Sequence, residues 1–497
     1  MNKLYYGDNI EVLEQYVGNE TIDLCYIDPP FNSKRDYNQI YNNVGKEDKA
    51  QVQAFVDTWE WDEAAMRGLE RFDLVEGERR YPEKTKLLVN SFANVLGRGS
   101  MLAYIISISQ RIIEIHRVLK PTGSFYLHCD ATASHYIKLI LDSVFCANGG
   151  DFQNEIIWSY QGTGESKKRF KRKHDTIFFY TKGKNHYFSD EGSSEPISDF
   201  SKSKYTKHDD DGSYKEIRHK DGKIYKQYMK DFMRMRDVWE IPVINAQARE
   251  RLGYPTQKPE TLLEKIILAS SKKGDVVLDA YCGCGTTVAV AERLKRKWIG
   301  IDITYQSVSL IMKRLTDTYG NEILNRFATF GIPRDIDSAK DLAQKSHSRK
   351  EFEIWSVMTY SNNKAIPNEK KGADGGFDGK MYITTSLSPK EQKPILFSVK
   401  SGRVNVAQIR DFIHVIDREQ AVAGVFITLN NPTRPMLHEA TLAGTYKNPL
   451  TGNPIEKLKI VTVQEIMNGE RENFPNPVEV LNKAARKVED NQGKLNF

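Results

Sequence analysis

The chain has 497 residues, which is more than a single hydrophobic core usually holds, so its length predicts two or three domains. Hydrophobic residues at 39% and charged residues at 28% are typical of globular proteins in water. No apolar run has the length of a bilayer span, so we expect no membrane partner. The net charge of +6 is mildly basic and permits, without requiring, a nucleic-acid partner.

The cysteines and the N-terminus predict a cellular location. Five cysteines are sparse and odd in number, which favours a reducing compartment over a disulfide framework. The first ten residues lack the apolar core of a secretory signal. Both observations predict a cytoplasmic protein. Cys282 and Cys284 are one residue apart, and no nearby Cys or His pair completes a zinc site around them.

The first predicted strand ends in Gly7-Asp8-Asn9, directly before a helix-like segment. A carboxylate at a strand end lies where α/β folds bind their ligands. The same residue type also commonly caps a following helix. Asp8 is therefore either a ligand-binding residue or a helix cap.

The next strand, residues 21–27, leads into Asp28-Pro29-Pro30-Phe31. Two prolines fix two successive φ angles at about −65° and remove two backbone donors, so this turn projects from the sheet. It presents a carboxylate, fixed carbonyl groups and an aromatic face. Such a set suits a flat heteroaromatic ring with an exocyclic amine, and a flipped-out nucleobase is such a ring. A solvated turn at a strand end is the alternative interpretation.

Residues 32–90 form a polar insert in which Trp59, Trp61 and many charges indicate a surface subdomain without an assignable chemistry. Beyond it, the apolar spacing predicts a helix over residues 101–119, which Lys120-Pro121-Thr122-Gly123 stops. Strands over 124–129, 155–160 and 176–180, with a helix over 136–145, follow. This alternation predicts parallel βαβ units and a doubly wound α/β sheet.

A basic segment lies between the last two of these strands. Its six basic residues surround Phe170, and we expect them to contact phosphates, since clustered Lys and Arg displace counterions from a nucleic-acid backbone. The alternative is a solvated loop. The residues are Lys167, Lys168, Arg169, Lys171, Arg172 and Lys173. Residues 185–249 then become polar, aromatic and basic, which fits either a base-reading module or a surface insertion.

A second turn carries a nucleoside-binding pattern. Tyr254-Pro255-Thr256-Gln257-Lys258-Pro259 introduces a helix over 260–269, and a buried strand then ends at Asp279. The glycine turn 281–287 opens a helix predicted to run to Lys297, and the following strand ends at Asp302. Glycines permit close approach of a ligand, and an acid after the second strand can accept both ribose hydroxyls. With one glycine pair only, S-adenosylmethionine fits better than a dinucleotide, with Asp279 or a nearby carbonyl on its ammonium group.

The order of these motifs resembles the beta class of DNA amino-methyltransferases, in which the catalytic motif precedes the cofactor motif and target recognition lies between them. The resemblance covers the first two-thirds of the chain and implies a Rossmann-like methyltransferase domain over 1–334, with a recognition insert at about 185–249. It implies DNA as the partner and S-adenosylmethionine as the cofactor. A homodimer is compatible with it.

The resemblance also implies roles for individual residues. Asp28, Pro29, Pro30 and Phe31 would hold the flipped base. The cofactor site would include Asp8, Lys258, Asp279, Tyr281, Gly283, Gly285, Thr286 and Asp302. Cys284 replaces the usual serine of the turn, and its small side chain is expected to preserve binding. An acid at the first motif position resembles adenine-modifying members, so adenine is the predicted target, with the cytosine amine as the alternative.

The C-terminal third forms a separate predicted unit. A charged linker over 335–350 precedes a helix from Glu351, a glycine-rich turn over 371–379, a strand over 395–400, a helix over 407–416 and a strand over 423–428. Residues 351–497 thus predict a second, smaller α/β domain. Strand alternation puts Ser398 and Lys400 on one face.

This unit resembles an Mrr-type PD-(D/E)xK restriction endonuclease core. The resemblance implies that Asp378, or alternatively Asp374, binds Mg²⁺ and that Lys400 activates or orients water. Ser398 stands where a metal-binding Glu or Gln is expected, and Glu353 can supply the missing oxygen. Two readings remain open: an active nuclease, which would give a combined restriction-modification protein, and a degenerate DNA-binding module.

Overall fold

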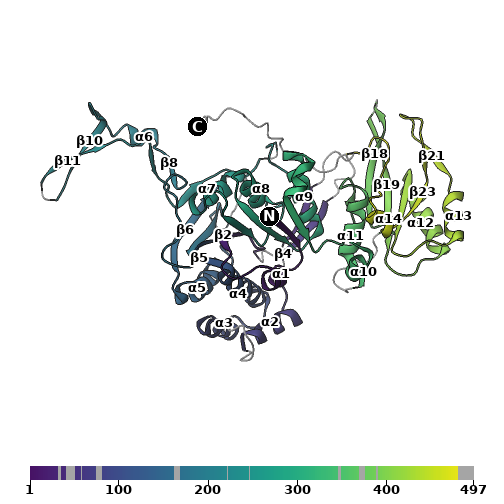
Figure 1. Cartoon of the computed structure of the whole chain (residues 1–497), viewed down its shortest axis with the longest axis horizontal. Coiled ribbons are helices and arrows are strands. Elements are labelled where there is room, and N and C mark those ends of the chain that lie inside the picture. Colours follow the sequence, from purple (N-terminus) through teal and green to yellow (C-terminus); the bar gives the residue numbers. More distant parts are fainter. Residues whose placement is uncertain are drawn as a thin grey trace.

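The computed structural model describes residues 1–31, 35–40, 51–57, 59–73, 81–161, 168, 170–220, 222–245, 247–344, 349–368, 375–387 and 390–478. Two separate sheets, each with its own helices, organise most of these residues (Figure 1). The predicted doubly wound α/β sheet with a second, smaller α/β unit is therefore confirmed.

The larger sheet has nine strands in the order β13-β6-β7-β5-β2-β14-β15-β1-β16. Strand β7 is antiparallel to both of its neighbours, and all other pairs in this sheet are parallel. The strands are β1 (Asn2–Tyr6), β2 (Ile22–Ile27), β5 (Leu119–Cys129), β6 (Asp151–Ser159), β7 (His174–Thr181), β13 (Val238–Glu240), β14 (Val276–Asp279), β15 (Lys297–Asp302) and β16 (Phe327–Phe330).

Helices cover both faces of this sheet because its central strands are apolar on both sides. In β2, Leu24 and Tyr26 pack into one core, whereas Cys25 and Ile27 pack into the other. The first core contains helices α7 (Glu260–Ser270), α8 (Thr286–Arg293) and α9 (Tyr305–Tyr319). The second contains α1 (Asn9–Tyr16), α4 (Ser100–Val118) and α5 (Ser134–Val144), with α2 (Glu63–Asp73) and α3 (Glu83–Leu96) packed outside them.

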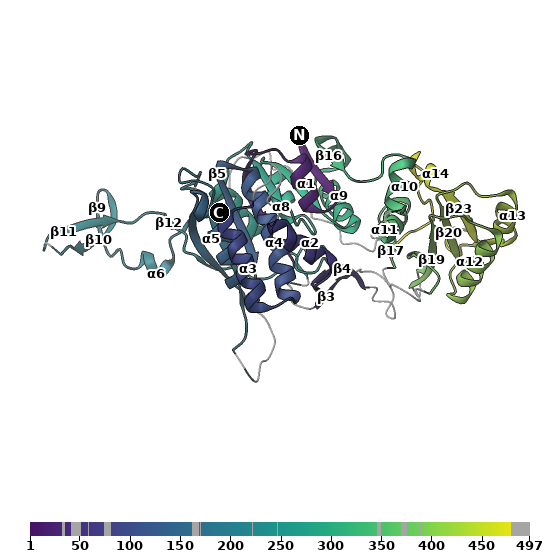
Figure 2. The ribbon, with the colours of Figure 1, turned by 90° about the horizontal axis from the view of Figure 1, so that it is seen from below.

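An arm extends from the β6 side of the sheet, at the end opposite the C-terminal unit (Figures 1 and 2). Its strands leave most side chains exposed or half-buried, so it has no core of its own. It lies within the predicted recognition insert. The elements are β8 (Ser194–Pro196), α6 (Asp199–Lys202), β9 (Lys207–Asp209), β10 (Gly212–Arg218), β11 (Ile224–Tyr228) and β12 (Phe232–Arg234).

The C-terminal unit is built on a five-stranded sheet in the order β17-β18-β19-β20-β23. Its strands are β17 (Ile366–Pro367), β18 (Gly379–Leu387), β19 (Lys390–Lys400), β20 (Ala423–Thr428) and β23 (Leu458–Thr462), with a β21 (Thr445–Lys447) and β22 (Pro454–Glu456) hairpin beside them. The helices are α10 (Ile336–Gln344), α11 (Arg349–Tyr360), α12 (Val406–Arg418), α13 (Arg434–Leu442) and α14 (Val463–Met467).

Several element boundaries differ from the sequence predictions. The strand predicted over 124–129 begins earlier, at Leu119, and the preceding helix stops at Val118. Residues 120–123 form a bulge of β5 between the pairs Ile22–Leu119 and Leu24–Ser124, where Pro121 needs no ladder hydrogen bond. Helix α8 ends at Arg293, before Lys295 with its φ of 60°. The polar insert contains a hairpin of β3 (Arg35–Ile40) and β4 (Gln51–Asp57) as well as α2.

The interval predicted as a linker contains helix α10. Ala339 and Ala343 of this helix are buried, and the helix packs against α11 and α14. In the described part of the chain, no helix is both long and apolar enough to cross a membrane.

Candidate active site

The Asp28-Pro29-Pro30-Phe31 turn follows β2 directly and lines a cavity of about 550 Å³. One carboxylate oxygen of Asp28, Oδ2, accepts a hydrogen bond from Lys258 Nζ. The other oxygen, Oδ1, is buried, and it has no hydrogen-bond partner among the described residues. A buried acceptor without a partner is costly in a folded protein, which is typical of an atom that awaits a ligand.

Lys258 belongs to the segment that was predicted to bind the cofactor, and the structure pairs it with Asp28. Its ammonium group also lies 5.6 Å from the centre of the Phe31 ring and 3.3 Å from the carbonyl oxygen of Thr256. The side chain is only 9% exposed. This cation neutralises Asp28 at one oxygen and leaves the other free to accept a donor.

The glycine turn lies across the cavity from Asp28 and has the expected backbone conformation. Gly283 and Gly285 have φ angles of 50° and 73°, in the left-handed region that favours glycine. A Cβ on Gly285 would lie 2.6 Å from a side-chain carbon of Ile311. Thr286 begins helix α8 immediately after the turn and lines the same cavity.

Two acids flank this turn, as the sequence predicts. Asp279, at the end of β14, is 4% exposed, and burial raises its pKa to about 7. Burial likewise raises the pKa of Asp302, at the end of β15. Asp302 accepts hydrogen bonds from the backbone N–H of Gly283 at 2.8 Å and of Thr304 at 3.0 Å. The acid thereby fixes the glycine turn relative to the next strand.

Asp8 caps a helix and also lines the cavity, so the predicted cap is confirmed and its ligand-binding role stays a prediction. Its carboxylate caps α1 by accepting from the Ile10 N–H at 3.0 Å, and it accepts from Arg111 at 2.9 Å while lining the cavity. The neighbouring Asn9 donates to the carbonyl oxygen of Ala280 at 2.8 Å. This contact ties the first strand end to the glycine turn.

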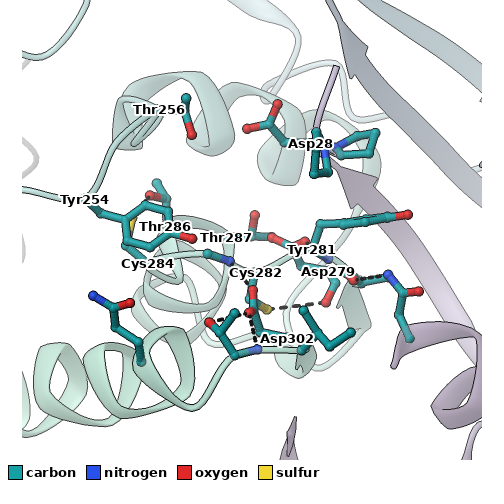
Figure 3. A pocket seen from close by; sticks show the side chains of 18 of the residues that line it. Asp28, Tyr254, Thr256, Asp279, Tyr281, Cys282, Cys284, Thr286, Thr287 and Asp302 are labelled. Atoms are coloured by element: carbon teal, nitrogen blue, oxygen red, sulfur yellow. Dashed lines mark hydrogen bonds between the residues drawn. The ribbon is translucent and has the colours of Figure 1, made fainter. Parts of the chain in front are cut away.

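The cavity therefore brings the predicted base-binding and cofactor-binding residues together, except Gly285, which does not line it. Asp28 lies at one side and Asp302 at the other, with Asp279 and Tyr281 nearby (Figure 3). Acidic residues outnumber basic residues in the wall, so the cavity favours a cationic ligand. The acids are Asp8, Asp28, Asp279, Asp302 and Glu351, and the bases are Arg111, Lys258 and Lys350.

Sequence reasoning missed three parts of this wall. Trp59, from the insert without an assigned chemistry, and Tyr254, whose ring lies over Gly283, both line the cavity. The third part comes from the C-terminal unit: Glu351 of α11 accepts from Tyr6 Oη at 3.0 Å and from the Tyr305 N–H at 3.0 Å. The sequence signals for these were the two tryptophans of the polar insert and the place of Tyr254 at the start of the 254–259 motif.

The basic segment lies between β6 and β7. Lys168, Lys171 and Arg172 are exposed, and Phe170 is 98% exposed, so this part is accessible to a large ligand. Lys173 is half-buried, and its carbonyl oxygen accepts from the Tyr160 N–H at 3.0 Å. Lys167 and Arg169 lie outside the described residues.

The C-terminal unit gathers the predicted nuclease residues at β18, β19 and α11. Asp378 is buried, accepts from the Val399 N–H at 2.7 Å, and lies 4.0 Å from Lys400 Nζ. Burial raises the pKa of Asp378, and the negative charge of Glu353 raises it further. Ser398 is buried on β19, and Asp374 lies outside the described residues. Within the described ranges, no three His, Cys, Asp or Glu side chains form a metal-binding group.

Comparison with known proteins identifies both units. Residues 22–313 match the DNA methylase family, and residues 345–446 match the restriction endonuclease family of the Mrr type, which confirms both resemblances at the family level. The DNA adenine methyltransferase YhdJ of Escherichia coli (strain K12) is 31% identical over 214 residues, 41% of this chain and 64% of YhdJ. The type II methyltransferase M.HpaI of Haemophilus parainfluenzae is 32% identical over 212 residues, 41% of this chain and 57% of M.HpaI.

Among solved structures, the PvuII DNA methyltransferase (cytosine-N4-specific) is similar with a TM-score of 0.37 and 16% identity, over 62% of this chain and 85% of the other. The chain spans less than two thirds of the length of the two curated relatives described above. The DNA methylase match alone covers more than half of this chain. The protein therefore belongs to the DNA methylase family.

Proposed function

We propose that this protein transfers a methyl group from S-adenosylmethionine to the exocyclic amine of adenine in DNA, in a restriction-modification context. The observation that carries the proposal is the unpartnered Oδ1 of Asp28, which lines one cavity together with Asp279 and Asp302. Methyl transfer needs an acceptor for an amine proton, and it needs a site for a cationic nucleoside.

The wall residues fit S-adenosylmethionine. Asp279 would accept its ammonium group and Asp302 its ribose hydroxyls, while Gly283 and Gly285 let the backbone approach closely. Tyr281, Thr286 and Asp8 would complete this part of the cavity. Bound there, the sulfonium group supplies an electrophilic methyl carbon.

The enzyme residues act on the amine of the base. Its lone pair is delocalised into the ring, so the free amine is a poor nucleophile. Hydrogen bonds from the amine to Asp28 Oδ1 and to the Pro29 carbonyl favour a pyramidal nitrogen. Phe31 stacks on the ring, and Pro30 keeps the turn rigid. Transfer of the methyl group to this nitrogen would release the cofactor sulfur as a neutral thioether. The proton that the nitrogen loses would pass by way of Asp28 Oδ1 to water. Positioning and electrostatics carry this step.

Two observations favour adenine over cytosine as the target base. The first residue of the catalytic motif is an acid, and the similar protein YhdJ is named a DNA adenine methyltransferase. The exocyclic amine of cytosine presents the same donor pair and is the alternative target.

DNA would contact two further regions. The basic residues from Lys168 to Lys173 suit phosphate binding, and the arm within 185–249 suits target recognition. We propose a methyltransferase domain over 1–334 and a second domain over 351–497. The connecting interval 335–350 contributes α10 and the first residues of α11, which pack with the second domain. A cytoplasmic location and a homodimer are further parts of the proposal.

A second candidate function, Mg²⁺-dependent DNA cleavage, is supported by the proximity of Asp378 to Lys400. Mg²⁺ commonly takes one or two carboxylates and keeps several waters, so Asp378 and Glu353 fit it. The ion supplies Lewis-acid activation of a water molecule. Lys400 would orient that water, and Ser398 would contribute at most a hydroxyl oxygen.

The test is transfer of labelled methyl from S-adenosylmethionine to mixed-sequence duplex DNA, followed by nucleoside analysis of the product. Methyl on the adenine amine is the expected result. Methyl on the cytosine amine would keep the mechanism and reverse the base. If the cofactor binds without transfer, the DNA-binding or nuclease function becomes the leading candidate.

A further inference from the structure

A buried histidine lies directly beneath the ring of Phe31. His128, near the end of β5, is fully buried, and its imidazole stacks on the Phe31 ring with 5.8 Å between ring centres and 25° between planes. The indole of Trp158 meets the imidazole edge-on at 5.5 Å and 89°. The imidazole of His128 therefore stacks on the Phe31 ring and also packs against the Trp158 indole.

Both nitrogens of this imidazole have a partner. Nδ1 lies 3.0 Å from Tyr26 Oη, and Nε2 lies 3.2 Å from Asp175 Oδ2. The other oxygen of Asp175 accepts from Tyr160 Oη at 3.2 Å. With both nitrogens bonded, the imidazole plane cannot rotate without breaking a buried hydrogen bond.

The charges fix the direction of these hydrogen bonds. Burial alone would raise the pKa of Asp175, but its hydrogen bond with His128 lowers the pKa below the ordinary value, so Asp175 is an ionised acceptor. Burial raises the pKa of Tyr26 well above its usual range, so its hydroxyl keeps the proton. Nε2–H therefore donates to Asp175, and Nδ1 accepts from Tyr26 when the imidazole is neutral.

The network joins the catalytic turn to the strands that flank the basic segment. Tyr26 precedes Asp28 by two residues at the end of β2. Asp175 lies near the start of β7, and Tyr160 follows β6. These strands are neighbours in the sheet, in the order β6-β7-β5-β2. The loop predicted to contact phosphates connects Tyr160 to β7.

We propose that His128 and Asp175 are positioning residues that hold the Phe31 ring in the orientation that receives the target base. This inference rests on the proposed methyl transfer, which it deepens by identifying what sets the geometry of the base site. Asp175 is separated from Phe31 by the imidazole, so it acts on the Phe31 ring through His128. Its charge also interacts with Lys258, the partner of Asp28.

The test is a double-mutant cycle between Asp175→Asn and Phe31→Ala in the full-length protein. The probes are labelled S-adenosylmethionine and mixed-sequence duplex DNA. The readouts are kcat, KM for DNA, Kd for the cofactor by calorimetry, and the thermal unfolding temperature. We expect each single variant to lower kcat by about 10- to 100-fold, since a small misplacement of a reacting group has effects of this size. The cofactor Kd should change less than about twofold, and the double variant should be no slower than Phe31→Ala.

The matched control is Asp142→Asn. Asp142 also accepts a hydrogen bond from a tyrosine of β7, Tyr180 Oη at 2.6 Å, but it does not line the cavity. This variant should keep kcat within about twofold of wild type. His128→Phe, which retains a flat platform, should recover part of the rate lost in His128→Ala.

Three results would overturn the inference: an unchanged kcat in Asp175→Asn, losses that multiply in the double variant, or a parallel loss of cofactor affinity and thermal stability, which indicates a merely structural network. Absence of transfer by the wild-type chain would overturn the proposed function and this inference with it. That outcome is distinguishable, because it appears before any variant is made.

Discussion

At Asp28, one carboxylate oxygen is paired with Lys258 and the other has no partner among the described residues. Replacing the carboxylate by an amide keeps the shape and removes the charge. We expect Asp28→Asn to lower methyl transfer by about 10²- to 10³-fold, comparable to the loss of one electrostatic contact in a transition state. Single-turnover transfer of labelled methyl measures this effect.

The control for that variant is Asp130→Asn. Asp130 follows the adjacent strand β5, and its carboxylate accepts from the Thr132 N–H at 2.8 Å outside the cavity. The Asp130→Asn variant should keep its methyl-transfer activity. Both variants should bind S-adenosylmethionine as the wild type does. Methylation that persists in Asp28→Asn would show that the catalytic assignment is wrong.

The raised pKa of Asp279 predicts that cofactor binding depends on pH. Its pKa of about 7 means that it is largely neutral below pH 7 and ionised above it. Only the ionised form attracts an ammonium group, so the affinity for S-adenosylmethionine should rise as the pH increases from about 6 to 8, by up to about tenfold per pH unit below the pKa. Calorimetric titrations across this range measure the change.

Asp279→Asn should bind weakly at every pH in that window and show no such rise. Asp302→Asn, which affects the ribose site, should bind weakly and keep a rise, but at lower pH, because the charge of Asp302 helps to raise the pKa of Asp279. A wild-type affinity that does not depend on pH would contradict the assignment of Asp279 to the ammonium group.

Residues whose position follows from local sequence were predictable. Asp28, Asp279 and Asp302 each follow a short apolar strand, and parallel strands end at the same edge of a sheet. Partners from distant segments were not predictable. Lys258 lies 230 positions from Asp28, and only the tertiary fold brings the two together. Glu351 and Trp59 entered the cavity wall for the same reason.

At the scale of elements, helix α11 contributes to the cavity of the first unit and acts on Asp378 of the second. Glu351 contacts Tyr6 and Tyr305 and lines the cavity, whereas the charge of Glu353 acts on Asp378. Residues two positions apart on a helix point in directions about 200° apart. One helix thus contributes a wall to each site.

Glu351 lies at the N-terminus of α9, which begins just after Asp302. Its negative charge is favourable beside the first free N–H groups of that helix. We expect Glu351→Gln to weaken S-adenosylmethionine binding by about two- to fivefold through the Asp302 loop. Calorimetry measures this change in cofactor affinity. The matched control is Glu353→Gln, on the other face of α11. Equal effects of the two variants would contradict this role.

Among the elements, strands and helices with clear periodicity were predictable, and irregular connections were not. The bulge at 120–123 depends on pairing with β2, and helix α10 depends on burying Ala339 and Ala343 against other helices. Both are consequences of tertiary packing, which local propensity does not contain.

For the whole molecule, two chemical sites on two sheets predict two separable activities. Asp378→Asn and Lys400→Ala should abolish Mg²⁺-dependent cleavage of duplex DNA and leave methyl transfer intact. Asp28→Asn should have the opposite effect. Cleavage assays with and without a chelator, on DNA from a strain without methylation, measure the first activity. If Lys400→Ala cleaves as well as the wild type, or if no cleavage is found, the nuclease function fails.

The shared helix α11 also constrains how this protein can be recombined. A chimera joined within 335–350 would exchange Glu351 together with the C-terminal sheet, and it would remove part of the cavity wall of the first domain. Transplanting the C-terminal unit onto another member of the DNA methylase family would likewise introduce a carboxylate that needs a Tyr6 hydroxyl and a helix N-terminus as partners. A workable exchange must therefore match the surface around Tyr6 and Tyr305 as well as the linker length.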